Sequence, residues 1–249
     1  MDLINQGLPL GRYFGTYVVL SFGHIIMLLY LASGARDAGV LGMGIVGLVF
    51  FLSILLHEFG HVFACKAVGG RADAIILGPM GGLAAVQPPD RPLPNFITTA
   101  GGPAVNGILL AACWALLQSH PLAMFIAGRS MPATALFIFL VFMVEINKLL
   151  LVLNLLPIFP MDGGRLMQHI LWPLAGYRNS MVITGMVGTV GGGILVVLGL
   201  GLRSVKIPYV DFTLGGSSDY FLLFIGITCA MASWGLYQRA MAMERWKKN

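Results

Sequence analysis

Residues 45–61 read IVGLVFFLSILLHEFGH, an apolar run that ends in two histidines and a glutamate. The residues before His57 are nearly all apolar and belong to a run, 40–68, that is long enough to cross a lipid bilayer. The last five residues form an H-E-x-x-H sequence. Residues i and i+4 of a helix share a face, so His57 and His61 can direct two imidazoles at one metal ion. The stretch therefore predicts a metal site inside a membrane helix.

The composition supports a membrane protein. The chain has 249 residues, of which 57% are hydrophobic and 10% charged, and its mean hydropathy is +0.86. A soluble domain carries about a quarter charged residues. The formal net charge of +5 comes without a basic run interleaved with aromatics, so we expect no nucleic-acid partner. Three cysteines lie in apolar stretches and are expected to be small buried hydrophobes.

Apolar stretches of roughly 20 residues predict the number of membrane spans. We expect six of them, with short connectors and no separate soluble domain, at 14–33, 40–68, 95–118, 133–159, 181–202 and 219–238. We therefore expect an all-α membrane protein, a bundle of about six transmembrane helices. It is expected to be one domain, 1–249, with a core at 40–165 and flanking helices at 14–33, 181–202 and 219–238.

The connector between the second and third spans differs from the others. Residues 72–86 are mostly apolar but are broken by a Gly-Pro-Met-Gly-Gly sequence at 78–82. Two short strands around this turn are predicted, and a membrane-associated β-hairpin with exposed edges could pair with an extended peptide. A plain amphipathic loop is the alternative.

The distribution of Lys and Arg predicts the orientation. With six spans, the side opposite to both termini holds only Arg36, Arg129, Arg203 and Lys206, while Lys148 falls within a span. All other basic residues share the side of the termini, including Arg12, Lys66, Arg71, Lys247 and Lys248. The positive-inside rule therefore predicts that both termini and the nearby motif face the cytoplasm. In a bacterium, this would be the inner membrane.

Catalytic zinc takes three protein ligands and leaves one position for water. Glu58, next to His57, can act on that water as general base and then donate a proton to the leaving amine. The alternative is a pair of polar residues satisfied inside a helix bundle. The third ligand must come from elsewhere in the chain, and the candidates are His24, Asp73, His120, Glu145, Asp162 and His169.

Depth in the membrane favours Asp162 among these candidates. The second and fourth spans run in the same direction, so Asp162 lies at the same predicted end as His57 and His61. Glu145 can instead pair with Lys148 at i+3, and His24 is expected to be a hydrogen-bonded packing residue. His120 falls on the opposite side, and His169 is kept as an alternative.

The residues around Asp162 add support. The sequence NLLPIFPMDGGR at 154–165 ends the predicted fourth span with two prolines and two glycines. Irregular backbone at membrane depth is tolerated where it is buried or lines a wet cavity. A hydrolase needs such a cavity, because water must reach the metal.

Together, these motifs resemble those of the site-2 protease family, the intramembrane zinc metalloproteases of peptidase family M50. The resemblance rests on the H-E-x-x-H motif at 57–61 and on Asn154-x-x-Pro157-x-x-Pro160-Met161-Asp162-Gly163. The family's Leu-Asp-Gly is Met-Asp-Gly here. Residues 101–106, GGPAVN, look like the motif in the family's third helix. The resemblance covers about residues 41–165, and the flanking spans match in number and hydrophobicity alone.

This resemblance implies a zinc metalloendopeptidase that cleaves membrane-spanning segments of other proteins in regulated intramembrane proteolysis. His57, His61 and Asp162 would bind one Zn²⁺, and Glu58 would be the catalytic acid/base. Asn154 would hold the substrate backbone or the oxyanion, although a helix cap is an alternative. Asn106 would face the substrate or pack against neighbours. Neither a PDZ domain nor a pair of CBS domains, as many members carry, is expected, and the oligomeric state is left open.

Two other classes of protein share parts of this pattern. A metal transporter would need paired polar residues in several spans and a repeat between its halves, and the sequence shows neither. A non-catalytic member of the family would have lost the glutamate or a ligand. All four positions are intact here, which favours the protease.

Overall fold

The computed structural model describes residues 7–34, 36, 39–79, 81–127, 130–207, 212–215 and 219–246. The chain divides into two compact units, residues 1–153 and 154–249, and each is described by itself. Met80 of the predicted turn lies outside the described residues, as do Arg129, Lys247 and Lys248 of the charge comparison. The assignment of 1–249 as one transmembrane protease domain stays a prediction.

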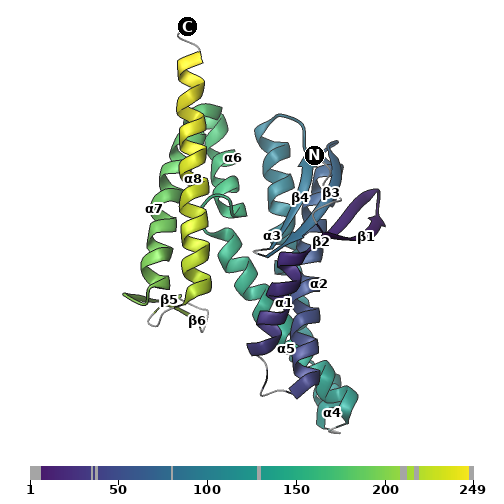
Figure 1. Ribbon diagram of the computed structural model, residues 1–249. Helices are drawn as coiled ribbons and strands as arrows, with labels where there is room; N and C mark the ends of the chain where they lie inside the picture. The colour runs from purple at the N-terminus through teal and green to yellow at the C-terminus, as the bar shows by residue number, and fades with distance from the viewer. Residues whose placement is uncertain are drawn as a thin grey trace. The chain divides into compact units, whose positions relative to one another are not determined.

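Helices form most of the first unit (Figure 1). Their bounds are α1 Phe22–Gly34, α2 Gly39–Ala67, α3 Pro92–Leu117, α4 His120–Ala127 and α5 Met131–Leu155, the last of which continues beyond residue 153. Pro92 stands in the first turn of α3, where its missing N–H costs no hydrogen bond. By length and composition, α2, α3 and α5 can each cross a membrane.

A four-stranded sheet packs beside α2 (Figure 1). Its strands are β1 Gly7–Tyr13, β2 Thr16–Ser21, β3 Arg71–Gly78 and β4 Gly81–Gln87, in the order β1-β2-β3-β4. Strands β3 and β4 pair antiparallel, as the predicted hairpin requires, while β2 pairs parallel to β3. The hairpin is therefore not an isolated two-stranded element.

The expectation of a first membrane span at 14–33 was wrong. Residues Thr16–Ser21 form a strand, and the helix that follows, α1, has 13 residues. At 1.5 Å per residue such a helix is about 20 Å long, whereas the hydrocarbon core of a bilayer is about 30 Å thick. Val18 and Val19 of this stretch are apolar because they are buried in the protein.

The all-α, six-span prediction is therefore corrected to a mostly helical protein with a small sheet. Among the described residues, five helices are long and apolar enough to cross a membrane. The expected spans at 40–68, 95–118, 133–159, 181–202 and 219–238 match them, with bounds shifted by a few residues. The predicted orientation assumed six spans and stays a prediction.

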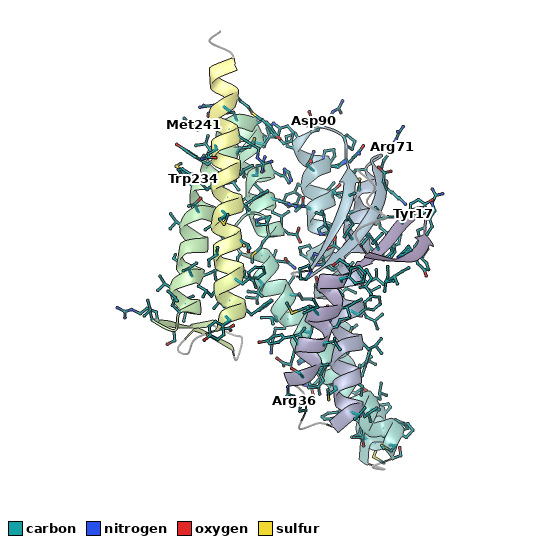
Figure 2. All side chains as sticks on the ribbon, viewed as in Figure 1. Tyr17, Arg36, Arg71, Asp90, Trp234 and Met241 are labelled. Carbon is teal, nitrogen blue, oxygen red and sulfur yellow. The ribbon has the colours of Figure 1, made fainter. Side chains whose placement is uncertain are left out.

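The core of the first unit joins the sheet to α2. Val18 of β2 and Ile75 and Leu77 of β3 pack with Ile54, Phe59 and Val62 of α2, all of them buried. This packing fixes the sheet beside the helix turn that carries the H-E-x-x-H motif. Figure 2 shows Arg71 and Asp90 at one end of this unit and Arg36 at the opposite end, with the apolar helices between them.

The second unit is built on an antiparallel helix pair. It contains α6 Asp162–Ala175, α7 Tyr177–Gly199, β5 Ser204–Ile207, β6 Phe212–Gly215 and α8 Tyr220–Trp246. Strands β5 and β6 pair antiparallel in the connection between α7 and α8. Ser233 of α8 donates a hydrogen bond to the Phe159 carbonyl at 2.8 Å, which ties the segment before α6 to this helix pair.

The burial of Val18 in strand β2 predicts the effect of shortening its side chain. Its side chain is 2% exposed, so Val18→Ala should lower the free energy of unfolding by about 1–3 kcal/mol through lost packing. The control is Leu29→Ala, because Leu29 on α1 is 67% exposed. Thermal unfolding of the purified protein in detergent measures both. An equal, small effect of the two changes would argue against the strand.

Candidate metal centre

Helix α2 brings His57, Glu58 and His61 into one buried place. Their side chains are 6%, 4% and 7% exposed. The two imidazole rings stand nearly perpendicular, at 83°, and their Nε2 atoms lie 3.1 Å apart. The i and i+4 spacing therefore produces the convergence of two ring nitrogens that the sequence predicted.

Hydrogen bonds on the other side of each ring decide which nitrogen carries the proton. His61 Nδ1 lies 2.9 Å from the carbonyl oxygen of Thr98, which can only accept, so His61 Nδ1 donates. His57 Nδ1 faces the side-chain oxygen of Asn106 and donates to it. In the neutral rings, Nε2 is then the unprotonated nitrogen of both histidines. Such outer hydrogen bonds are typical of histidines that bind a metal.

The geometry of the histidine pair fits a zinc ion. Two nitrogens at about 2.0–2.1 Å from a tetrahedral zinc lie about 3.3–3.4 Å apart, close to the observed 3.1 Å. Two unprotonated nitrogens facing each other across this distance repel, and a shared cation removes that repulsion. The pair therefore suits a divalent cation that accepts imidazole nitrogen.

Two glycines allow the backbone to approach these side chains. A Cβ atom at Gly102 of α3 would lie 2.4 Å from His61 Nε2 and 2.6 Å from His57 Nε2. A Cβ atom at Gly82 of β4 would lie 2.2 Å from Glu58 Cγ. Any larger residue at either position would displace the ring nitrogens or the carboxylate. The helix and the strand thus form two walls of the centre.

The other candidate ligands have different partners. His24 is fully buried, places Nδ1 2.8 Å from the Gly78 carbonyl and stacks on Phe50, which confirms it as a packing residue. Glu145 and Lys148 form the expected ion pair at 2.6 Å. The remaining candidates are Asp73, exposed on β3, His120, the first residue of α4, and His169 in α6.

The two other predicted site residues belong to the second unit. Asn154 lies in the last turn of α5 and is partly buried. Asp162 is buried and is the first residue of α6, where the helix dipole favours a carboxylate. Residues 156–161, between the two helices, are non-helical and contain Pro157 and Pro160, as predicted. Their roles, like that of Glu58, stay predictions.

Sequence reasoning missed several residues around the histidines. Thr98 contacts His61 through its backbone carbonyl, a group that every residue has, so the sequence gives no signal for it. Gly82 and Gly102 matter through the absence of a side chain. Asn147 stands about two turns before Asn154 on an apolar helix. A polar residue in an apolar membrane helix was the signal that could have found it.

Comparisons with known proteins place the chain in a family. A model of the peptidase M50B-like family matches residues 25–161. A Synechocystis protein provisionally named a zinc metalloprotease is 30% identical over 219 residues, which cover 82% of this chain and 55% of that protein. The zinc metalloprotease MJ0392 of Methanocaldococcus jannaschii is 28% identical over 200 residues, covering 79% and 55%. The chain thus spans about half the length of the curated relatives it matches.

A solved structure shows the same fold. The site-2 protease from Methanocaldococcus jannaschii superimposes with a TM-score of 0.61 at 21% identity, covering 92% of this chain and 94% of that one. This likeness concerns the fold alone. With the family match over residues 25–161, the chain belongs to the peptidase M50B-like family, that of the site-2 proteases.

The position of Gly102 yields a test of the metal centre. Gly102→Ala would place a methyl group against both Nε2 atoms, so the purified protein should lose nearly all its bound zinc. Metal content by mass spectrometry measures this. Gly107→Ala, on the same helix, is the control, since no atom lies within 4 Å of the added Cβ. A Gly102→Ala protein with full zinc content would contradict the geometry.

Proposed function

We propose that this protein is a zinc metalloendopeptidase that hydrolyses peptide bonds in membrane-spanning segments of other proteins. The observation that carries the proposal is the buried histidine pair, whose Nδ1 atoms face oxygen acceptors and whose Nε2 atoms converge, with a glutamate beside it on the same helix. The family match and the five apolar helices support the reaction and its membrane setting.

We infer that Asp162 supplies the third zinc ligand. His57, His61 and Asp162 offer two imidazole nitrogens and a carboxylate oxygen, a donor set that could hold a metal ion. All three side chains are buried, and a buried carboxylate needs a cation or hydrogen bonds. Two histidines and one carboxylate are the ligand set of several catalytic zinc sites.

A zinc ion at this place would act as a Lewis acid on the scissile carbonyl. Glu58 would take a proton from the attacking water and then deliver it to the nitrogen of the leaving amine. Its burial beside the β4 backbone keeps the carboxylate in place and limits the access of other water. The side-chain amide of Asn154 would donate a hydrogen bond to the substrate carbonyl oxygen as negative charge develops there.

The edge strand β4 is the element that we propose holds the substrate. A helical substrate hides its carbonyls in its own hydrogen bonds, so a segment must unwind before cleavage. Strand β3 is paired on both sides, by β2 and β4, whereas β4 ends the order of the sheet. An extended segment can add to such an edge through main-chain hydrogen bonds. Gly82 would place that segment beside Glu58.

The distribution of charge supports a cytoplasmic location of the centre. Arg71 and Asp90 lie at the end of the first unit near the sheet, opposite to Arg36 (Figure 2). We propose that this end, with the H-E-x-x-H half of α2, faces the cytoplasm, because Lys66, Arg71 and Arg91 lie between the last turn of α2 and the start of α3. The substrates would then be membrane proteins that reach the centre from within the bilayer.

Replacing Glu58 tests the proposed chemistry. Glu58→Gln keeps the size of the side chain and removes its ability to accept the proton from water. Cleavage of a membrane-spanning substrate in detergent should fall by at least about 10²-fold, in the range of general acid–base catalysis. Zinc content should stay at the wild-type level. Turnover retained by the variant would rule out the proposed role of Glu58.

A second change tests the third ligand. Asp162→Asn removes the negative charge but keeps the volume, and zinc affinity should fall by about tenfold or more. The matched control is Asp73→Asn, because Asp73 is exposed on β3. Competition with a zinc chelator measures both affinities. Equal affinities of the two variants would assign the third ligand to another residue.

A further inference from the structure

A chain of buried hydrogen bonds leads from His57 through the first unit. Asn106 of α3 accepts from His57 Nδ1 and donates through Nδ2 to Asn147 Oδ1 at 2.7 Å. Asn147 of α5 donates through its own Nδ2 to Ser53 Oγ at 3.0 Å and to the Met143 carbonyl at 2.8 Å. Ser53, Asn106 and Asn147 are all fully buried. This chain therefore connects α2, α3 and α5 through direct hydrogen bonds.

The direction of every bond in this chain follows from one backbone group. The Met143 carbonyl can only accept, so the side-chain atom of Asn147 beside it must be the NH₂ group. Asn147 Oδ1 then faces Asn106 and requires its NH₂ group in turn. That leaves Asn106 Oδ1 toward His57, where it can only accept.

The opposite orientation of Asn106 would prevent metal binding. Its NH₂ group would then donate to His57 Nδ1, and the proton of the neutral ring would move to Nε2. A protonated Nε2 has no lone pair for a metal ion. The amide orientation of Asn106 therefore selects the histidine tautomer that can act as a ligand.

We propose that Asn147 is a positioning residue of the metal centre: it orients the Asn106 amide and thereby fixes His57 in its ligand tautomer. This inference rests on the proposed zinc site, although it concerns metal affinity and not cleavage. Asn147 acts through Asn106 and touches neither the proposed metal nor the substrate. Ser53 accepts the second proton of the Asn147 amide, so that its NH₂ group is fully paired.

The test compares Asn147→Leu with the unchanged protein in titrations of the metal-free form with Zn²⁺ and Co²⁺. Leucine is similar in size but cannot orient Asn106, so affinity should fall by about tenfold or more. The visible Co²⁺ spectrum should change with it. The control is Leu140→Ala, which opens a cavity in α5 at a buried position outside the hydrogen-bond chain. It should bind metal as the wild type does.

A second background separates orientation from packing. In Asn106→Asp, both carboxylate oxygens accept, so His57 Nδ1 donates whichever way the group turns. Asn147→Leu should then weaken metal binding by less than about threefold, in contrast to its effect beside Asn106. An equal loss in both backgrounds, or none in either, would overturn the proposal.

One measurement needs no variant at Asn147. Nitrogen-15 NMR of the metal-free wild-type protein reports the tautomer of His57, with His57→Gln to assign its signals. The proposal expects the proton on Nδ1, and a proton on Nε2 would overturn it. If the wild type and Asn147→Leu bind zinc equally well, this inference alone is refuted. Wild-type protein that binds no zinc refutes the proposed function.

Discussion

A metal ion at the two histidines of α2 would require unprotonated nitrogens inside an apolar helix bundle, and the neighbouring elements of the first unit meet this requirement. In water, each neutral imidazole would exchange between tautomers. Here the Thr98 carbonyl and the Asn106 amide oxygen accept from the two Nδ1 atoms, so both Nε2 atoms converge. Without these acceptors, the i, i+4 spacing alone would not leave both Nε2 atoms unprotonated and ready to bind a metal ion. Helix α2 brings the two rings close together, while Thr98 and Asn106 of α3 determine that each ring carries its proton on Nδ1.

The surrounding fold meets this requirement with small residues and buried packing. Helix α3 approaches the ring nitrogens at Gly102, and strand β4 approaches the carboxylate at Gly82. The sheet is held against α2 by Ile75 and Leu77, which are completely buried. The edge strand β4 therefore lies beside Glu58, the proposed acid/base, in a protein that is otherwise mostly helical. This arrangement would bring an extended substrate to the centre.

The sequence predicted the parts of the structure that follow from local pattern. The H-E-x-x-H spacing places His57 and His61 on one helix face, and the glycine-rich turn at 78–82 marks the strand pair. Hydropathy failed at Val18 and Val19, because a strand buried by protein and a helix buried by lipid are equally apolar. The parallel pairing of β2 with β3 joins residues far apart in sequence and has no local signal. The contacts of Asn106 with His57 and Asn147 likewise arise from tertiary packing.

The proposed function requires that His57 and His61 bind a zinc ion with their Nε2 atoms. X-ray absorption at the zinc edge of the purified protein tests it most directly. We expect about one zinc per chain, with two imidazole nitrogens and oxygen donors at about 2.0–2.2 Å. A shell of sulfur donors at about 2.3 Å, or the same spectrum after both histidines are replaced, would contradict it.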